Sequence, residues 1–413
     1  MRIGFFGGTF DPFHNGHLAL LESAYKAAKL QKIIVMPVGT PPHKHDRIRF
    51  AAHRYEMARL ATENLKYVEL SDLEIRREGK AFTLDTVRLL KASHTNKGVV
   101  PKIDLISGSD IIEAIENWHE PAALLQEVRL LVALRGDADA AALEIKAERL
   151  RQKYEARIKF FPMDRSSVSS TALRAALQQC ESIKDAVPDA VYRFIKTNRI
   201  YDFAAELAAI DDATWAEMQR LERLIWPLMP QRRRGHTINV TLYAIRLALR
   251  HGLDVRQAAL AGMAHDCAKY LPLREQRKLA KRAGFLGGID DDVLHGPAGS
   301  YYARKHFGIT DRDVLAAIFY HTTSRGLMTR LDQVLYLADK IEYGRPYKDL
   351  AAIRKAAAEN LDKAMQICLT EVYKALARRK KTAHPFTEAA RLTLAHFGEA
   401  DSVSKRTKEE NKK

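Results

Sequence analysis

The sequence has few cysteines and no long apolar run. Its three cysteines, Cys180, Cys267 and Cys368, are widely separated and odd in number, which excludes a disulfide framework and a thiol metal site. No apolar stretch is long enough to span a bilayer, and the N-terminus enters an apolar strand-like run without a basic and apolar leader. We therefore expect a cytoplasmic protein of a reducing compartment that does not interact with membranes.

Acidic residues are scarce relative to basic ones. The chain has 67 Lys and Arg against 51 Asp and Glu, a formal charge of +16. Up to residue 205 the counts are 31 against 26, and beyond it 36 against 25, so most of the excess lies in the second part. We interpret its basic clusters as solvated helix faces and a disordered end. A positive field of this kind attracts polyanionic nucleotides and predicts no specific nucleic acid. The clusters are Arg232–Arg234, Arg378–Lys381 and Lys405–Lys413.

A chain of 413 residues exceeds what one hydrophobic core usually supports, so two domains are expected. From residue 1 to about 200, apolar strand-like runs alternate with helical segments. This alternation predicts an α/β doubly wound, Rossmann-like domain, with a parallel sheet covered by helices and ligands at the carboxyl ends of the strands. The expected strands are residues 3–6, 32–37, 67–70, 103–107, 128–134 and 158–161.

After Tyr201 the pattern changes to helical periodicity with almost no strand signal. We expect a first domain at residues 1–203, a linker at 204–212 and an all-α domain at 213–397. The polar segment 398–413 is expected to be a disordered tail.

The stretch from Gly7 to Leu18 reads Gly-Gly-Thr-Phe-Asp-Pro-Phe-His-Asn-Gly-His-Leu. It follows the apolar run Ile3–Phe6 and precedes a helical pattern, so His14 and His17 lie where a strand passes into a helix. The unpaired N–H groups and positive dipole end of a helix start favour bound phosphate, to which imidazoles can add donors. A Walker loop is excluded because no Lys-Ser/Thr follows the glycines, and the glycine spacing excludes the dinucleotide fingerprint.

Four further blocks follow expected strands, where a doubly wound fold places its function. Serines that start a helix are explained as N-caps without any ligand. Arg174 is harder to explain in this way, because a cation opposes the dipole at a helix start unless an anion is bound. The blocks are Met36–Lys44, Leu73–Thr86, Ser107–Asp110 with the nearby Trp118, and Ser166–Arg174.

Together the five blocks resemble the nicotinate mononucleotide adenylyltransferases, in which Pro-Pro-His-Lys (41–44) and Phe-Thr-Leu-Asp-Thr (82–86) distinguish the family from its sisters. The resemblance implies in-line attack of the mononucleotide phosphate on ATP, with Mg²⁺ bridging the polyphosphate. His14, His17 and Arg174 would stabilise charge on the phosphate oxygens. The implied ATP contacts are Gly8, Thr9, Phe10, His17, Gly108, Asp110, Ser169, Ser170 and Arg174. The implied nicotinate mononucleotide contacts are Lys44, Thr83, Trp118 and His119, although Trp118 also suits ordinary core packing.

A second set of ligand-type residues lies in the helical part. Adjacent His265 and Asp266 in an apolar helix are costly to bury unless they are paired or bind metal. Six nitrogen and oxygen ligands on five segments are what a pair of divalent ions would need. The six are His236, His265, Asp266, His295, His321 and Asp339.

The contexts of these residues, above all Tyr-His-Thr-Thr (320–323) and Leu-Ala-Asp-Lys-Ile-Glu (337–342), resemble the HD-domain phosphohydrolases. The resemblance is specifically to the bacterial branch that cleaves diadenosine tetraphosphate symmetrically into two ADP. The resemblance implies two divalent or mixed-valence metal ions bridged by Asp266, with iron expected and manganese the alternative. Lys269 is implied as a catalytic residue and Arg345 as a second cation. Tyr343 stands where the family pattern has a proline.

The sequence thus predicts a bifunctional enzyme that acts on ATP, nicotinate mononucleotide and dinucleoside polyphosphates. An alternative makes the second domain a regulatory nucleotide-binding module without turnover. A third interpretation, an RNA-binding protein, depends on charge alone and lacks the aromatic pattern of a stacking surface. A homo-oligomer is left open.

Overall fold

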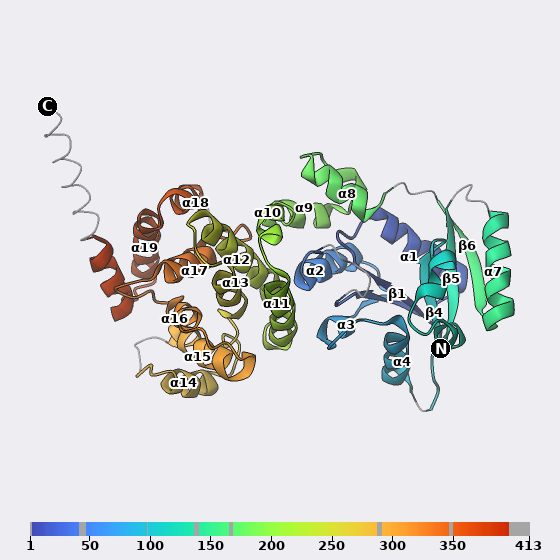
Figure 1. Ribbon diagram of the computed structural model, residues 1–413, viewed down its shortest axis with the longest axis horizontal. Coiled ribbons are helices and arrows are strands. Elements are labelled where there is room, and N and C mark those ends of the chain that lie inside the picture. The colour runs from blue at the N-terminus through green and yellow to red at the C-terminus, as the bar shows by residue number, and fades with distance from the viewer. Residues whose placement is uncertain are drawn as a thin grey trace. The chain divides into compact units, whose positions relative to one another are not determined.

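The computed structural model describes residues 2–40, 47–96, 98–135, 140–164, 168–286, 291–346 and 350–395. The chain forms two compact units, Met1–Asp202 and Phe203–Lys413 (Figure 1). Among the described residues, no helix has both the length and the apolar composition that crossing a membrane requires.

The first unit is built on a six-stranded sheet whose neighbouring strands all pair in parallel. The strand order is β3-β2-β1-β4-β5-β6, so the direction of winding reverses between β1 and β4. A doubly wound sheet opens a ligand-binding crevice at such a reversal, at the carboxyl ends of the strands. The α/β prediction is confirmed, and every expected strand is present. They are β1 (Arg2–Gly8), β2 (Lys32–Pro37), β3 (Val68–Leu70), β4 (Lys102–Gly108), β5 (Val128–Arg135) and β6 (Arg157–Met163).

Helices cover both faces of this sheet because the buried strands are apolar on both sides. Phe6 of β1 packs into one core cluster with residues of α1, α2, α8 and α9, whereas its neighbour Phe5 packs into another with residues of α4–α7. Successive strand side chains point to opposite faces, which explains the division. The helices are α1 (Asn15–Ala28), α2 (Ala51–Thr62), α3 (Leu73–Arg76), α4 (Thr83–His94), α5 (Ile111–Ala114), α6 (Pro121–Glu127), α7 (Ala140–Tyr154), α8 (Ser170–Gln178) and α9 (Asp189–Asn198).

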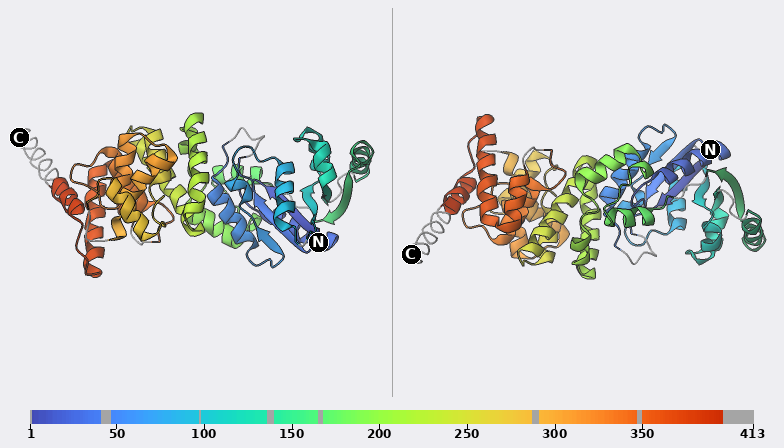
Figure 2. Two further views of the ribbon diagram at one scale, coloured as in Figure 1. Left: turned by 90° about the horizontal axis from the view of Figure 1, so that it is seen from below. Right: turned by 90° about the horizontal axis from the view of Figure 1, so that it is seen from above.

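The described residues of the second unit form helices joined by loops and include no strand, as expected for an all-α domain, and Figure 2 shows it from two further sides. Its long helix α12 packs against both α13 and α17, which brings these three helices together. The helices are α10 (Ala204–Ala208), α11 (Asp212–Ile225), α12 (Gln231–Arg250), α13 (Val255–Ala264), α14 (Leu273–Arg282), α15 (His295–Tyr302), α16 (Arg312–Tyr320), α17 (Arg330–Ile341), α18 (Leu350–Glu359) and α19 (Leu361–Arg378).

The segment predicted as a linker, 204–212, contains the short helix α10. This helix packs on α12 within the second unit, where Arg246 Nε donates a hydrogen bond to Glu206 Oε1 at 2.5 Å. Arg246 also donates to the hydroxyl of Tyr343 at 3.0 Å. The segment is thus tied to the loop that follows α17. The expected tail, 398–413, lies outside the described residues.

Candidate functional sites

The two motif histidines form the start of helix α1. His14 is the N-cap in an extended conformation, and its backbone N–H donates to Nδ1 of His17 at 3.1 Å. The two imidazole rings stack with centroids 3.6 Å apart and planes 18° from parallel. This capping box satisfies helix-terminal N–H groups with histidines where other helices use Ser or Glu. Both rings are therefore fixed at the carboxyl edge of β1.

Asp11 anchors the same loop, a role that the sequence did not reveal. Its buried carboxylate accepts hydrogen bonds from the Tyr201 hydroxyl at 2.7 Å and from the backbone N–H of Arg49 at 3.1 Å. Burial, with a further contribution from Asp11, raises the pKa of Tyr201 well above its usual value, so the phenol stays a donor. Arg174 Nη1 donates to the Asp11 carbonyl at 2.8 Å, which ties the start of α8 to the loop.

Two pockets open beside this loop in the first unit. One is lined by His14, His17 and the serines Ser169 and Ser170 at the start of α8, where Ser169 caps the helix by accepting from the Ala172 N–H. The other joins the end of β1 to the region expected for nicotinate mononucleotide. Its lining includes Gly8, Thr9, Glu74, Thr83, Trp118 and His119.

Other described residues predicted for the first site do not line these pockets. Gly108 ends β4 and Asp110 is exposed just before α5, but neither lines either pocket. Phe10 is buried and packs against the ring of His17, with centroids 5.2 Å apart. Lys44 lies outside the described residues.

Glu74 is an unexpected buried carboxylate in the second of these pockets. Thr86 Oγ1 donates to Glu74 Oε1 at 2.7 Å, and burial raises the pKa of Glu74 despite this hydrogen bond. Across the same pocket, the ring of His119 stacks on Phe82 with centroids 4.2 Å apart. Trp118 is half-buried, packs on the core cluster of Phe5 and lines the pocket, so it serves as core and as pocket wall.

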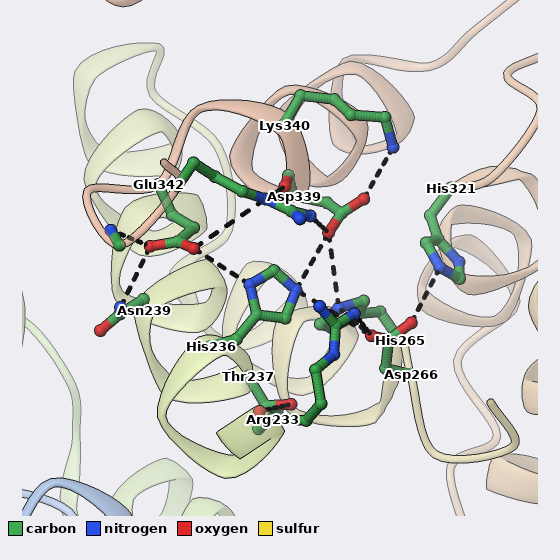
Figure 3. Close-up of polar contacts among 12 residues, drawn as sticks. Arg233, His236, Thr237, Asn239, His265, Asp266, His321, Asp339, Lys340 and Glu342 are labelled. Atoms are coloured by element: carbon green, nitrogen blue, oxygen red, sulfur yellow. Dashed lines mark hydrogen bonds and ion pairs between the residues drawn. The ribbon is translucent and has the colours of Figure 1, made fainter. Parts of the chain in front are cut away.

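The six ligand-type residues of the second unit converge in its interior. They come from α12, the ends of α13 and α16, the first residue of α15, and α17. Two groups can each hold a metal ion, His236 with His265 and Asp266, and Asp266 with His295 and His321, with the ligand atoms of each group within 4.8 Å of one another. Figure 3 shows Asp339 facing the first group.

Asp266 is shared between the two groups through its two oxygens. Its Oδ2 lies 3.5 Å from His265 Nε2, whereas its Oδ1 lies 3.4 Å from His295 Nε2 and 3.6 Å from His321 Nε2. Asp339 Oδ1 adds a fourth ligand-type atom to the first group, 3.1 Å from His236 Nε2. The geometry suits a carboxylate that bridges two cations.

The protonation of the histidines fits metal ligation. His265 Nδ1 lies 2.7 Å from the Gly262 carbonyl, and His321 Nδ1 lies 2.7 Å from the Ile318 carbonyl. Because a carbonyl can only accept, each Nδ1 donates, and a ring whose single N–H is at Nδ1 presents the lone pair of Nε2. Burial lowers the pKa of His265, and it lowers the pKa of His295 to about 3.

The lone pairs therefore point at a carboxylate. The buried Nε2 atoms of His265 and His321 have no hydrogen-bond partner among the described residues, yet both face Asp266. Lone pairs that face an anion repel it unless a cation lies between them. The second unit is therefore suited to bind divalent metal.

Cations surround both carboxylates of this centre. Arg233 Nη2 lies 2.6 Å from Asp266 Oδ2 and Lys269 Nζ lies 3.1 Å from it. Arg345 Nη2 and Lys340 Nζ contact Asp339 at 2.6 and 2.7 Å. Although burial would raise the pKa of Asp339, Lys340, His236 and Arg345 hold it well below its usual value. The carboxylates thus stay ionised at neutral pH.

Two contributors to this centre were missed or misinterpreted from the sequence. The interpretation of Arg233 as part of a solvated basic face is wrong, because its side chain is 18% exposed and pairs with Asp266. Its position three residues before His236 places both on one helix face, which was the available signal. Glu342 accepts from His236 Nδ1 at 3.0 Å and from Asn239 Nδ2 at 3.0 Å (Figure 3). It orients His236 as a carboxylate behind a ligating histidine does.

Comparison with known families agrees with this two-part architecture. The Cytidylyltransferase-like family matches residues 5–176, and the HD domain family matches residues 233–344. A crystal structure described as a predicted HD superfamily hydrolase involved in NAD metabolism, from Clostridium acetobutylicum, is 35% identical. It covers 43% of this chain and 96% of its own, with a TM-score of 0.42.

Two relatives cover different extents of the chain. A Mycoplasma pneumoniae protein described as "Probable nicotinate-nucleotide adenylyltransferase/Ap4A hydrolase" is 28% identical over 374 residues, 89% of this chain and 98% of that protein. A Clostridium tetani protein described as "Probable nicotinate-nucleotide adenylyltransferase" is 35% identical over 199 residues, 48% of this chain and 96% of that protein. The chain belongs to the nicotinate-nucleotide adenylyltransferase family through its first unit, and its second unit carries an HD domain.

Proposed function

We propose that the chain is a bifunctional enzyme whose first unit transfers AMP from ATP to nicotinate mononucleotide, releasing pyrophosphate and nicotinate adenine dinucleotide. The observation that carries the proposal is a pair of pockets on either side of the loop after β1, one lined by His14 and His17 and the other by Thr9 and Trp118. Relatives named for this activity match nearly their whole length to the first unit.

The first reaction needs no protein nucleophile, because the mononucleotide phosphate itself attacks the α-phosphorus of ATP. Catalysis then depends on holding the reactants in line and on stabilising charge on the phosphate oxygens. His14 and His17, fixed by their capping box, supply donors at the positive end of α1. Arg174, held by the Asp11 carbonyl, adds a cation, and Mg²⁺ would bridge the polyphosphate. We assign the ring pocket of Thr83, Trp118 and His119 to the pyridine nucleotide.

The second unit hydrolyses diadenosine tetraphosphate symmetrically into two ADP. The six ligand residues would hold two metal ions, for which iron is our first choice and manganese the second. When bound, such a pair activates water as a nucleophile and neutralises phosphate charge. Arg233, Lys269, Lys340 and Arg345 position the two carboxylates and present positive charge around the centre.

Product analysis with separate substrates tests both halves of the proposal. Purified chain is given ATP and Mg²⁺ with either nicotinate or nicotinamide mononucleotide, or diadenosine tetraphosphate with iron or manganese. His17→Ala should abolish most pyrophosphate release and leave ADP formation intact, whereas Asp266→Asn should do the reverse. Absence of bound metal together with no ADP formation would refute the hydrolase and favour the regulatory module. Unchanged pyrophosphate release by His17→Ala would refute the role of that histidine.

A further inference from the structure

The second unit has a pocket of about 760 Å³ that contains none of the six metal-ligand residues. It is lined by residues of α14, α15 and α16 and by residues 384–386. Helix α15 packs against both α14 and α16 (Figure 1). A volume of this size is typical of small-molecule sites.

Four arginines and no acidic residue line this pocket. Arg325 is neutralised by Asp332 at 2.6 Å. Arg282, Arg304 and Arg312 are exposed and make no ion pair with a carboxylate of the described residues. Three guanidinium groups that no carboxylate neutralises surround one cavity, and a ligand with several negative charges requires such a set.

Aromatic rings form part of the wall. Phe285 stacks with His384, with centroids 5.7 Å apart and planes at 24°, and packs edge-on against Phe319. Burial lowers the pKa of His384, which keeps its ring neutral. Tyr301 lies beneath Arg304, with the guanidinium 5.3 Å from the ring centroid. Ring faces beside arginines suit a planar base joined to phosphates.

The backbone at Arg304 departs from regular helix. Residues Ala303–Phe307 form a π-helical turn at the end of α15, and such turns occur frequently at functional sites. This turn presents Arg304 to the pocket, while the first residue of the same helix is His295 of the metal centre.

We propose that this pocket binds a nucleotide with two or more phosphates at a site separate from the metal centre. The base lies against Phe285, Phe319 and Tyr301, and the phosphates pair with Arg282, Arg304 and Arg312. An acidic peptide would satisfy the arginines and leave the rings unused, so the nucleotide is favoured.

Equilibrium dialysis of labelled ADP against the full, metal-loaded chain tests the site. The double variant Arg304→Gln/Arg312→Gln should lose one ADP per chain or bind it at least about tenfold more weakly. The control Arg274→Gln/Arg378→Gln removes two exposed arginines outside the pocket and should bind as wild type. Circular dichroism confirms folding, and hydrolysis of diadenosine tetraphosphate should keep its KM in both variants.

Four results would overturn the proposal. An unchanged number and affinity of ADP sites in the Arg304→Gln/Arg312→Gln variant would show that the pocket does not bind it. An equal loss in the control variant would show diffuse attraction by net charge. A raised KM for diadenosine tetraphosphate in the pocket variant alone would make the pocket part of the substrate site. Displacement of ADP by an acidic peptide as efficiently as by ATP would refute recognition of the base.

Discussion

Arg233 and Asp266 form a partly buried ion pair in which Arg233 Nη2 lies 2.6 Å from the oxygen that faces His265. Arg233 thus holds one oxygen of the carboxylate that both candidate metal groups share. Lys269, three residues after Asp266, contacts the same oxygen. A bridging carboxylate whose orientation is fixed by a guanidinium has less freedom to rotate away from either ion.

Substitution Arg233→Gln should therefore lower the rate of ADP formation from diadenosine tetraphosphate by about 10- to 100-fold, the usual effect of removing a group that orients a ligand. Pyrophosphate release by the first unit should be unchanged. The matched control is the exposed neighbour Arg232→Gln, which should retain full hydrolysis. Equal rates for the two variants would show that the ion pair does not orient the carboxylate.

Glu342 is predicted to act through His236. Glu342→Gln removes the charge opposite His236 Nδ1 and should lower metal affinity about 10-fold or more, with a smaller change in rate at saturating metal. Metal titration followed by elemental analysis measures the effect. Exposed Glu371→Gln, which loses only a surface pair with Lys374, is the control. Wild-type metal retention in Glu342→Gln would refute the positioning role.

Features that a single segment of the sequence specifies could be predicted from the sequence. The strands have apolar patterns, and the six candidate metal ligands stand in histidine and aspartate motifs, which can be recognised one segment at a time. Asp11, Glu74 and Arg233 could not be found in this way, because their roles depend on partners from distant segments such as Tyr201 and Asp266.

The arginine-rich pocket was missed for the same reason. Arg282, Arg304 and Arg312 come from separate helices, and each one alone is typical of a solvated surface. Only the packing of α15 between α14 and α16 brings them around one cavity.

Glu74 should make the stability of the first unit dependent on pH. Burial raises its folded pKa above the unfolded value of about 4.3, so its favourable contribution is complete below that pH and is lost as pH rises through the folded pKa. Glu74→Gln should therefore increase the unfolding free energy relative to wild type at neutral pH, and the difference should shrink near pH 4. Amide hydrogen exchange in β1 and β4 measures the unfolding free energy of the first unit separately from that of the second unit. Exposed Glu181→Gln should show no such trend.

Replacement of Trp118 should weaken the binding of the pyridine nucleotide and leave the binding of ATP unchanged. The indole lines the pocket with Thr83 and His119, and stacking of a base on an aromatic ring contributes about 1–3 kcal/mol. Trp118→Leu keeps an apolar side chain against Ile115 and its core cluster, so the fold should persist. The KM for nicotinate mononucleotide should rise about tenfold or more, while the KM for ATP stays within about twofold.

Steady-state kinetics with each substrate varied in turn measures the split. Trp215→Leu in the second unit is the control for loss of an indole and should leave both KM values unchanged. If Trp118 were only core, Trp118→Leu would lower the melting temperature and leave the ratio of the two KM values as in wild type. A change in that ratio without loss of stability is therefore the result that assigns the indole to the pyridine ring.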